Sequence, residues 1–224
     1  GGRGVRGAEW GGAGGSGGVH GGAGRGGGSG RGGGRYSRRD QGGRPVVQTP
    51  AQEVRVYEVI EEGGSLRWKI AEQWDLSKVL PKDVSASDVV PDWQGNYWFI
   101  SGFGHLGYID RTSGAIDVIE LGGGDETIGA ALTVGPDAAF VLTSKALYRL
   151  HASPSGPQVT WRWDYGAAGG VDLSTPTLID QGSLIAFSIN GQGDRGLLVV
   201  LKTSDEAMPD QDREVCRMPL FKPG

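Results

Sequence analysis

One unit of this sequence recurs three times at a spacing of about 44 residues. Each copy has a turn that carries an Asp, an apolar run, a short polar loop, a second apolar run and a final hairpin. The copies occupy residues 87–121, 130–165 and 174–221. Four short strands in a repeat of this length are the pattern of a β-propeller blade. The repeat therefore predicts an all-β fold. It does not predict the function, because binding and catalytic residues of such folds lie mostly in loops whose sequences vary freely.

Two alternating runs precede the first copy. Residues 54–60 and 66–70 alternate apolar and polar side chains around a Glu-Glu-Gly-Gly-Ser turn, which is the signal of a hairpin. We interpret residues 54–74 as a half-blade and expect an incomplete propeller of about three and a half four-stranded antiparallel blades. Because a propeller protects its sheet edges by closing with four to eight blades, the chain is expected to be a fragment of a longer one.

The composition changes sharply near residue 44. Residues 1–44 hold 22 of the 43 glycines and eight arginines, with Glu9 and Asp40 as the acids, for a net charge of +6. Because the whole chain sums to −4, residues 45–224 carry −10. Residues 1–44 also contain few apolar side chains. Burial of so few side chains cannot offset the conformational entropy lost on ordering, which is about 1–2 kcal/mol per residue. We predict a disordered Gly/Arg-rich tail at 1–44 and a partial propeller at 45–224.

The tail allows three interpretations. Arg and Gly in this proportion are typical of segments that bind RNA through phosphate charge and Arg stacking. The same composition suits a plain linker, or the translation of a shifted reading frame in a GC-rich gene. No run in the chain approaches the roughly 20 apolar residues of a membrane span, so none is expected.

Several apolar residues are expected in the core. The strands Tyr97–Ile100, Ala139–Leu142 and Leu184–Phe187 are apolar at consecutive positions, which predicts burial of both faces between neighbouring sheets. Cys216 lies among apolar neighbours and is expected to be a buried structural thiol. The tryptophans are assigned to core packing, except Trp93, which lies in a turn and is expected to be exposed.

Two short segments resemble those of a known superfamily. Residues 108–114 resemble the outer-hairpin Asp-x-x-Thr-Gly turn of quinoprotein-like (PQQ-like) β-propellers, and residues 174–178 resemble their Thr-Pro-Thr strand. The quinone site is not carried over, because Val118 stands where quinoprotein dehydrogenases have a docking Trp. Other stretches are similar to uncharacterised bacterial exported propeller proteins, in which further chain follows; they are 87–99, 125–134 and 215–224. The resemblance implies a propeller fragment, a location outside the cytoplasm and no PQQ.

Polar residues are expected to gather on one face of the propeller. In a four-stranded blade, the loops between the second and third strands and the links between blades emerge around the central channel. Every link here brings a carboxylate to this channel rim, which suggests a cation site, with calcium as the candidate, or an acid/base pair. The alternative is that these are solvated loops, since Asp favours turns. The candidate ligands are Asp88, Asp125, Glu126, Asp172, Asn190, Asp194 and Arg195.

The favoured function is a non-enzymatic platform that binds a ligand or a protein partner at the channel rim. No nucleophile paired with a base is visible, although the pattern leaves open whether the chain is an enzyme. The first alternative is a cation-assisted hydrolase of the lactonase or strictosidine-synthase-like propeller kind. The second alternative is RNA binding through the tail; no other part of the sequence indicates a nucleic-acid site.

Overall fold

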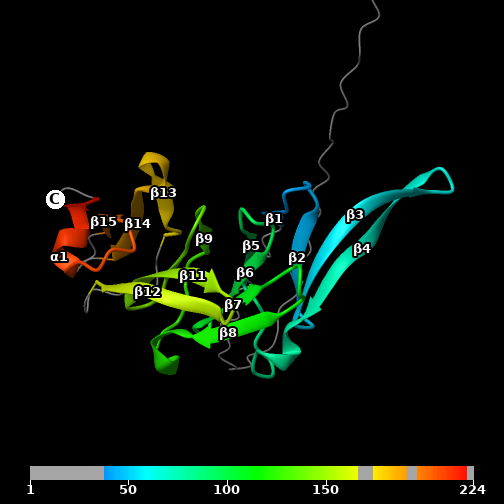
Figure 1. The fold of residues 1–224 in the computed structure, drawn as a ribbon, viewed down its shortest axis with the longest axis horizontal. Helices are drawn as coiled ribbons and strands as arrows, with labels where there is room; N and C mark the ends of the chain where they lie inside the picture. Colours follow the sequence, from blue (N-terminus) through cyan, green and yellow to red (C-terminus); the bar gives the residue numbers. More distant parts are fainter. Residues whose placement is uncertain (1–37, 166–173, 191–195, 221–224) are drawn as a thin grey trace, which may run out of the picture. The chain divides into compact units, whose positions relative to one another are not determined.

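The structure is a computed structural model that describes residues 38–165, 174–190 and 196–220. Its strands form four antiparallel sheets of four strands each, and neighbours in the chain are neighbours in each sheet (Figure 1). The first sheet contains β1 (Arg38–Arg39), β2 (Pro45–Thr49), β3 (Glu53–Glu62) and β4 (Ser65–Asp75). The second contains β5 (Asp88–Pro91), β6 (Tyr97–Ile100), β7 (His105–Ile109) and β8 (Ile116–Glu120). The third contains β9 (Thr133–Val134), β10 (Ala139–Leu142), β11 (Ala146–Ser153) and β12 (Gly156–Asp164). The fourth contains β13 (Thr177–Ile179), β14 (Leu184–Asn190), β15 (Gly196–Lys202) and β16 (Glu214–Pro219).

Helical segments within the described residues are short. They are three 3₁₀ turns, Leu76–Lys78, Leu121–Gly124 and Asp180–Gly182, and the helix α1 (Asp210–Arg213). The first of these turns begins after Asp75, whose carboxylate accepts a hydrogen bond from the backbone N–H of Ser77. None of the helices in the described ranges has the length and apolar character needed to cross a membrane.

The first sheet corrects the predicted half-blade at 54–74. Strands β1 and β2 complete it, and Val46 of β2 is fully buried. These strands escaped the sequence pattern because β1 is two arginines long and follows a Gly-rich stretch. The predicted tail boundary at 44 is also wrong, since Arg44 pairs with Asp40 at 2.6 Å and with Glu72 at 2.7 Å. Residues 1–37 of the predicted tail lie outside the described residues.

Hydrophobic cores fill the spaces between successive sheets. Tyr97 and Phe99 of β6 belong to the core shared with the first sheet, whereas Trp98 and Ile100 belong to the core shared with the third. Strand β10 divides its side chains in the same way between the second and fourth sheets. The prediction that these two strands are buried on both faces is therefore confirmed, because each has a neighbouring sheet on either side.

The fourth sheet departs from this prediction. Ile185 and Phe187 of β14 are buried against the third sheet, but Leu184 and Ala186 on the opposite face are only half-buried. The reason is that the described residues give this sheet one neighbour. Cys216 lies on the outer strand β16 and is half-buried, so its assignment as a buried thiol is wrong.

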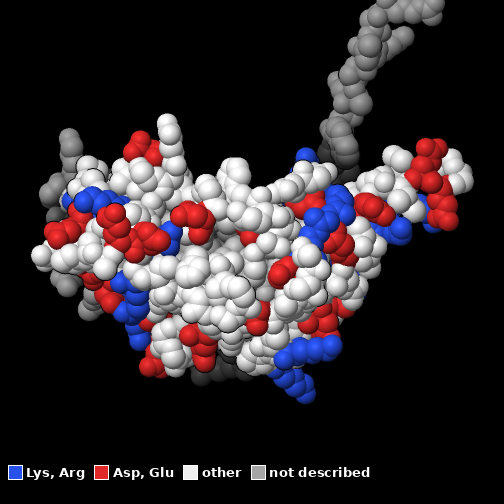
Figure 2. Space-filling view, in the orientation of Figure 1, with Lys and Arg blue, Asp and Glu red and all other residues white. Residues whose placement is uncertain are grey.

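Strands β3 and β4 run on beyond the rest of the first sheet as a two-stranded hairpin (Figure 1). Trp68 on this hairpin is 65% exposed, which contradicts its assignment to the core, because no sheet covers it among the described residues. Trp93 is 66% exposed, as predicted. Acidic and basic side chains lie together on the hairpin in Figure 2, where Glu58 pairs with Lys69 at 3.3 Å.

Candidate functional site

Asp88 lies inside the fold, where it connects three sheets. Its carboxylate is on β5, is 2% exposed, and accepts hydrogen bonds from Arg38 Nη2 of β1 and from the backbone N–H of Leu132, both at 3.2 Å. Leu132 directly precedes β9, so this carboxylate ties the first strands of successive sheets together. The sequence predicted Asp88 as a ligand at the channel rim. In the structure its carboxylate is instead buried and used to hold the sheets together.

Glu126 is buried in the link between the second and third sheets and is 3% exposed. Its carboxylate accepts hydrogen bonds from Thr143 Oγ1, from Tyr148 OH at 3.1 Å and from Arg162 Nη2 at 2.9 Å. Burial alone would raise the pKa of this carboxyl, but the Thr143, Arg162 and Tyr148 donors outweigh it and hold the pKa below its usual value. Glu126 is therefore a structural carboxylate that already has its cation.

The glycines before Glu126 explain how its side chain reaches this place. Gly122 has a φ of +64°, and a Cβ at this residue would lie 2.3 Å from Cγ of Glu126. Only glycine provides both the left-handed backbone and the space. The Gly-rich link thus positions a buried side chain, a role that the sequence did not reveal.

The other rim candidates do not assemble into a described site. Asp125 is exposed. Asn190 ends β14, where its backbone is paired with Gly196. The remaining three, Asp172, Asp194 and Arg195, lie outside the described residues. Within 38–165, 174–190 and 196–220, no three His, Cys, Asp or Glu side chains are grouped in a way that could hold a metal ion.

A different carboxylate stands out in the turn between β5 and β6. Asp92 is 7% exposed, and its Oδ1 accepts hydrogen bonds from the backbone N–H groups of Gln94 at 2.9 Å and Asn96 at 2.8 Å. Its Oδ2 accepts one from Tyr108 OH at 3.1 Å. Among the described residues, every hydrogen-bond donor to Asp92 is neutral, and no Lys or Arg forms an ion pair with it.

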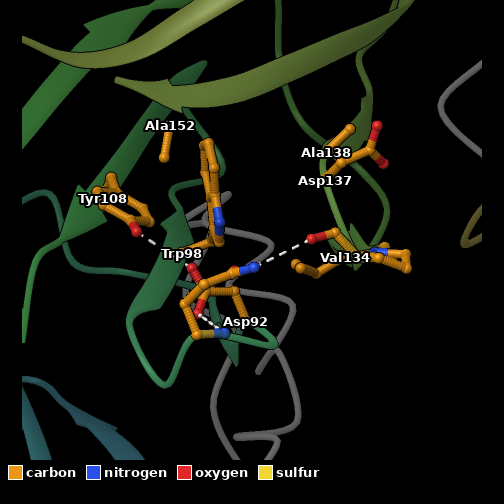
Figure 3. A pocket seen from close by; sticks show the side chains of 10 residues that line it. Asp92, Trp98, Tyr108, Val134, Asp137, Ala138 and Ala152 are labelled. Carbon is orange, nitrogen blue, oxygen red and sulfur yellow. Dashed lines mark hydrogen bonds between the residues drawn. The ribbon is translucent and has the colours of Figure 1, made fainter. Parts of the chain in front are cut away.

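Asp92 borders an open cavity of about 260 Å³ between the second and third sheets. The opposite wall is the turn from Val134 to Ala138, and Gln94 Nε2 reaches across to the carbonyl of Pro136 at 3.3 Å. Figure 3 shows Trp98 standing between Tyr108 on one side and this turn on the other. We name this space the Asp92 cavity; its lining is Asp92, Gln94, Trp98, Tyr108, Val134, Gly135, Pro136, Asp137, Ala138 and Ala152.

The indole N–H of Trp98 has no hydrogen-bond acceptor among the described residues. The side chain is 3% exposed, yet its nitrogen is not among the polar atoms that are sealed from solvent without a partner. Trp98 also lines the Asp92 cavity. The cavity therefore presents a buried carboxylate and an indole N–H that is not sealed from solvent and has no described acceptor.

A second cavity of about 320 Å³ lies between the third and fourth sheets and shares the Gly135–Asp137 turn with the first. Its buried charged group is Arg149, 4% exposed, which donates hydrogen bonds to Asp137 Oδ2 and Thr160 Oγ1, each at 3.0 Å. Arg149 is opposite Phe140 in the third sheet, as Tyr108 is opposite Trp98 in the second. The same position of the repeat thus carries a neutral donor in one cavity and a cation in the next.

The sequence missed Asp92 and Tyr108 as site residues. The available signal was the Asp that recurs in the first turn of every repeat, at Asp92, Asp137 and Asp180. The sequence could not show that the Asp92 turn lies across a cavity from the Val134–Ala138 turn of the next sheet. The distance between the two turns depends on how the second and third sheets pack.

Comparisons with known proteins identify the fold. No family model matches the chain, and no curated protein matches its sequence. The β-propeller domain of Swd1 from Myceliophteria thermophila matches with a TM-score of 0.56 and 11% identity, over 80% of this chain and 56% of that one. A protein from Bacteroides uniformis assigned as a 6-phosphogluconolactonase matches with a TM-score of 0.56 and 10% identity, over 82% and 56%. The WD40 domain of Sif2 matches with a TM-score of 0.51 and 12% identity, over 71% and 42%.

The chain has a β-propeller fold. Its four sheets are those of an incomplete propeller, as the repeat predicted, and the chain spans about half the length of these structures. At 10–12% identity, the likeness extends to the fold and no further.

Proposed function

We propose that this chain is a non-enzymatic propeller platform and that the Asp92 cavity is its binding site. The observation that carries the proposal is a buried carboxylate without a described cation in an open cavity that an indole N–H without a described acceptor also lines. A ligand can supply the positive charge that the carboxylate lacks, and it can replace water as the acceptor for the indole N–H.

The chemistry of the cavity favours binding over catalysis. Burial and the nearby Asp92 charge raise the pKa of Tyr108, so its hydroxyl remains a protonated donor at neutral pH. The Asp92 carboxylate is fixed by the two backbone N–H groups of its turn. Among the described residues, the ionisable groups of the lining are Asp92, Asp137 and Tyr108, and no Ser, Cys, Lys or His lies beside them to form a pair of nucleophile and base.

A screen of small polar and charged compounds against the full chain tests this proposal, with the indole N–H signals in nitrogen-15 NMR spectra as the readout. Compounds that bind should shift the Trp98 signal, which is assigned by its loss in Trp98→Phe. Trp93→Phe is the matched control, because Trp93 is exposed and does not line the cavity. If hits shift other tryptophans and leave Trp98 unchanged, the binding site is elsewhere.

The hydrolase alternative requires a cation at the channel rim. Of the rim candidates, Asp125 remains exposed, whereas Asp88 and Glu126 are used inside the fold. The test is a calcium assay together with an assay of ester or lactone hydrolysis. The hydrolase alternative would be correct, and the platform wrong, if calcium binds in a fixed ratio and the hydrolysis is abolished by EDTA and weakened by Asp125→Asn.

We also propose that the chain is part of a longer, exported propeller of the quinoprotein-like kind that does not bind PQQ. The half-buried apolar residues on the outer face of the fourth sheet, such as Leu184 and Ala186, support a further blade there. The length of the intact open reading frame and the presence of a signal peptide in it test this proposal. RNA binding by residues 1–44 would appear as an affinity that falls steeply with salt and disappears when the tail is removed.

A further inference from the structure

We propose that the Asp92 cavity binds a basic side chain of a peptide, with its ammonium or guanidinium group at Asp92 and the peptide carbonyl on the indole N–H of Trp98. This inference rests on the proposed platform function and names the partner of the same site. It follows from the charge of the cavity, from the neighbouring cavity, and from the aromatic side chains beside the carboxylate.

The charge of the cavity selects a cation. Asp92 accepts three hydrogen bonds from neutral groups, and a carboxylate has room for about four. Its Oδ2 accepts a single described hydrogen bond, from Tyr108, so this oxygen has the remaining capacity. Asp137, the other carboxylate of the lining, has a side chain that is 79% exposed and that pairs with Arg149 at 3.0 Å, so it adds little net charge near the solvent side. An anionic ligand would be repelled mainly by the Asp92 carboxylate.

The neighbouring cavity shows how the same fold accommodates a cation. At the position that corresponds to Tyr108, the third sheet has Arg149, which is buried and paired with the turn carboxylate of Asp137. That cavity therefore contains its own guanidinium beside its own turn acid. The Asp92 cavity has the turn acid but no described cation, so a cation from a partner would complete the equivalent pair.

The aromatic side chains suit a basic group. Trp98 and Tyr108 are 4.8 Å apart between ring centroids and 61° apart in plane, and both line the cavity beside Asp92. A cation near such rings is attracted by their π-electrons, and the attraction increases where water is excluded. In Figure 3 the Tyr108 hydroxyl points toward Asp92, and the Trp98 ring stands next to Tyr108.

The indole N–H of Trp98 distinguishes a peptide from a free amine. A peptide carbonyl can replace water as the acceptor for this donor, which an ammonium ion cannot do. A peptide that inserts a Lys or Arg side chain brings backbone carbonyls along with it. A ligand with a cation and an acceptor a few bonds apart can therefore contact both the Asp92 carboxylate and the Trp98 N–H at once.

The test uses the full 224-residue chain and two blocked tripeptides, acetyl-Gly-Lys-Gly-amide and the same peptide with norleucine in place of lysine. Titration calorimetry at low salt gives the two dissociation constants. We expect the lysine peptide to bind at least about tenfold more tightly, because the peptides differ in their charge and hardly in their shape. High salt should reduce this difference. Equal affinities would overturn the proposal.

Variants locate the site. Asp92→Asn should raise the dissociation constant of the lysine peptide at least about tenfold, and Trp98→Phe should raise it about threefold to tenfold by removing the N–H donor. Glu61→Gln, on the exposed β3–β4 hairpin, is the charge-matched control and should leave it unchanged. The Asp92 carboxylate also accepts hydrogen bonds from the backbone of its own turn, so Asp92→Asn could fold poorly. In that case Trp98→Phe and the salt dependence of binding test the proposal. Unchanged affinity in a folded Asp92→Asn or in Trp98→Phe contradicts the proposal.

Methylammonium chloride separates the two parts of the inference. If methylammonium binds as tightly as the lysine peptide, the peptide part is wrong. If compounds from the screen bind at Trp98 while the lysine peptide does not, the platform stands and this inference fails. If neither the compounds nor the peptide shifts Trp98, both fail.

Discussion

The two cavities on either side of the Gly135–Asp137 turn have similar positions in the repeat and opposite electrostatics. Between the second and third sheets, the acid Asp92 is buried and its side-chain donor Tyr108 is neutral. Between the third and fourth sheets, the cation Arg149 is buried and its acid Asp137 has a side chain that is 79% exposed. At one register position, Arg149 thus gives the second cavity a cation of its own, whereas Tyr108 leaves the Asp92 cavity without one among the described residues.

The largest expected effect concerns a buried carboxylate that already has its cation. Glu126→Ala should destabilise the fold by about 3 kcal/mol, because Thr143, Tyr148 and Arg162 each lose a buried hydrogen bond and Arg162 keeps only its contacts with Tyr148 and Asp164. Chemical denaturation measures this loss, and binding at the Asp92 cavity should not change. The neighbouring Asp125→Asn is the control and should stay within about 0.5 kcal/mol, since Asp125 is exposed. Equal effects of the two substitutions would mean that Glu126 is not structural.

Tyr108→Arg would give the Asp92 cavity the residue that the third sheet has at the same position. The new guanidinium should pair with Asp92 and reduce lysine-peptide affinity about 30-fold, which corresponds to about 2 kcal/mol. Tyr108→Phe removes the hydroxyl without adding charge, and it should bind the peptide with wild-type affinity or better. A folded Tyr108→Arg protein that still binds the peptide normally would break the comparison between the two cavities.

The buried carboxylate of Glu126 also predicts a pH dependence of stability. The pKa of Glu126 in the folded chain is below its usual value of 4.5, so this group contributes stability above the unfolded pKa and loses it as pH falls through the folded pKa. Denaturation midpoints should therefore decrease on acidification below about pH 4.5, and less so in Glu126→Gln. An acid dependence that is identical in the variant would assign the effect to other carboxylates.

The smallest effect is expected at Asp137. Its ion pair with Arg149 at 3.0 Å involves an exposed carboxylate, so Asp137→Asn should cost about 0–1 kcal/mol of stability. Its negative charge near the solvent side of the Asp92 cavity should matter slightly for binding, with lysine-peptide affinity reduced about twofold. A loss as large as that of Asp92→Asn would mean that Asp137 holds the basic group directly.

The sequence predicted the parts of the fold that repeat and missed those that depend on neighbours. Tyr97–Ile100 and Ala139–Leu142 were recognised because a run of apolar residues implies a sheet on either side. Strand β1 was missed because two arginines carry no such pattern, and Leu184 was misassigned because the pattern does not say whether a further sheet follows.

Of the predicted site residues, the sequence could identify the types but not their environments. The rim interpretation treated Asp88 and Glu126 as loop carboxylates, yet their partners Arg38 and Arg162 are 50 and 36 residues away in the chain. Asp92 was visible as a repeated turn residue, but its role depends on Tyr108 and on the space left beside the next sheet. A local sequence pattern does not show which distant residues the packing of sheets brings together.

The most direct test of the comparison is the indole N–H signal of Trp98 in a titration of the full chain with acetyl-Gly-Lys-Gly-amide. This signal should move in the wild-type protein and in Trp93→Phe, and at the same peptide concentration it should move far less in folded Tyr108→Arg. Movement of the Trp98 signal to the same extent in wild-type and Tyr108→Arg proteins, or no movement in the wild type, would contradict the account.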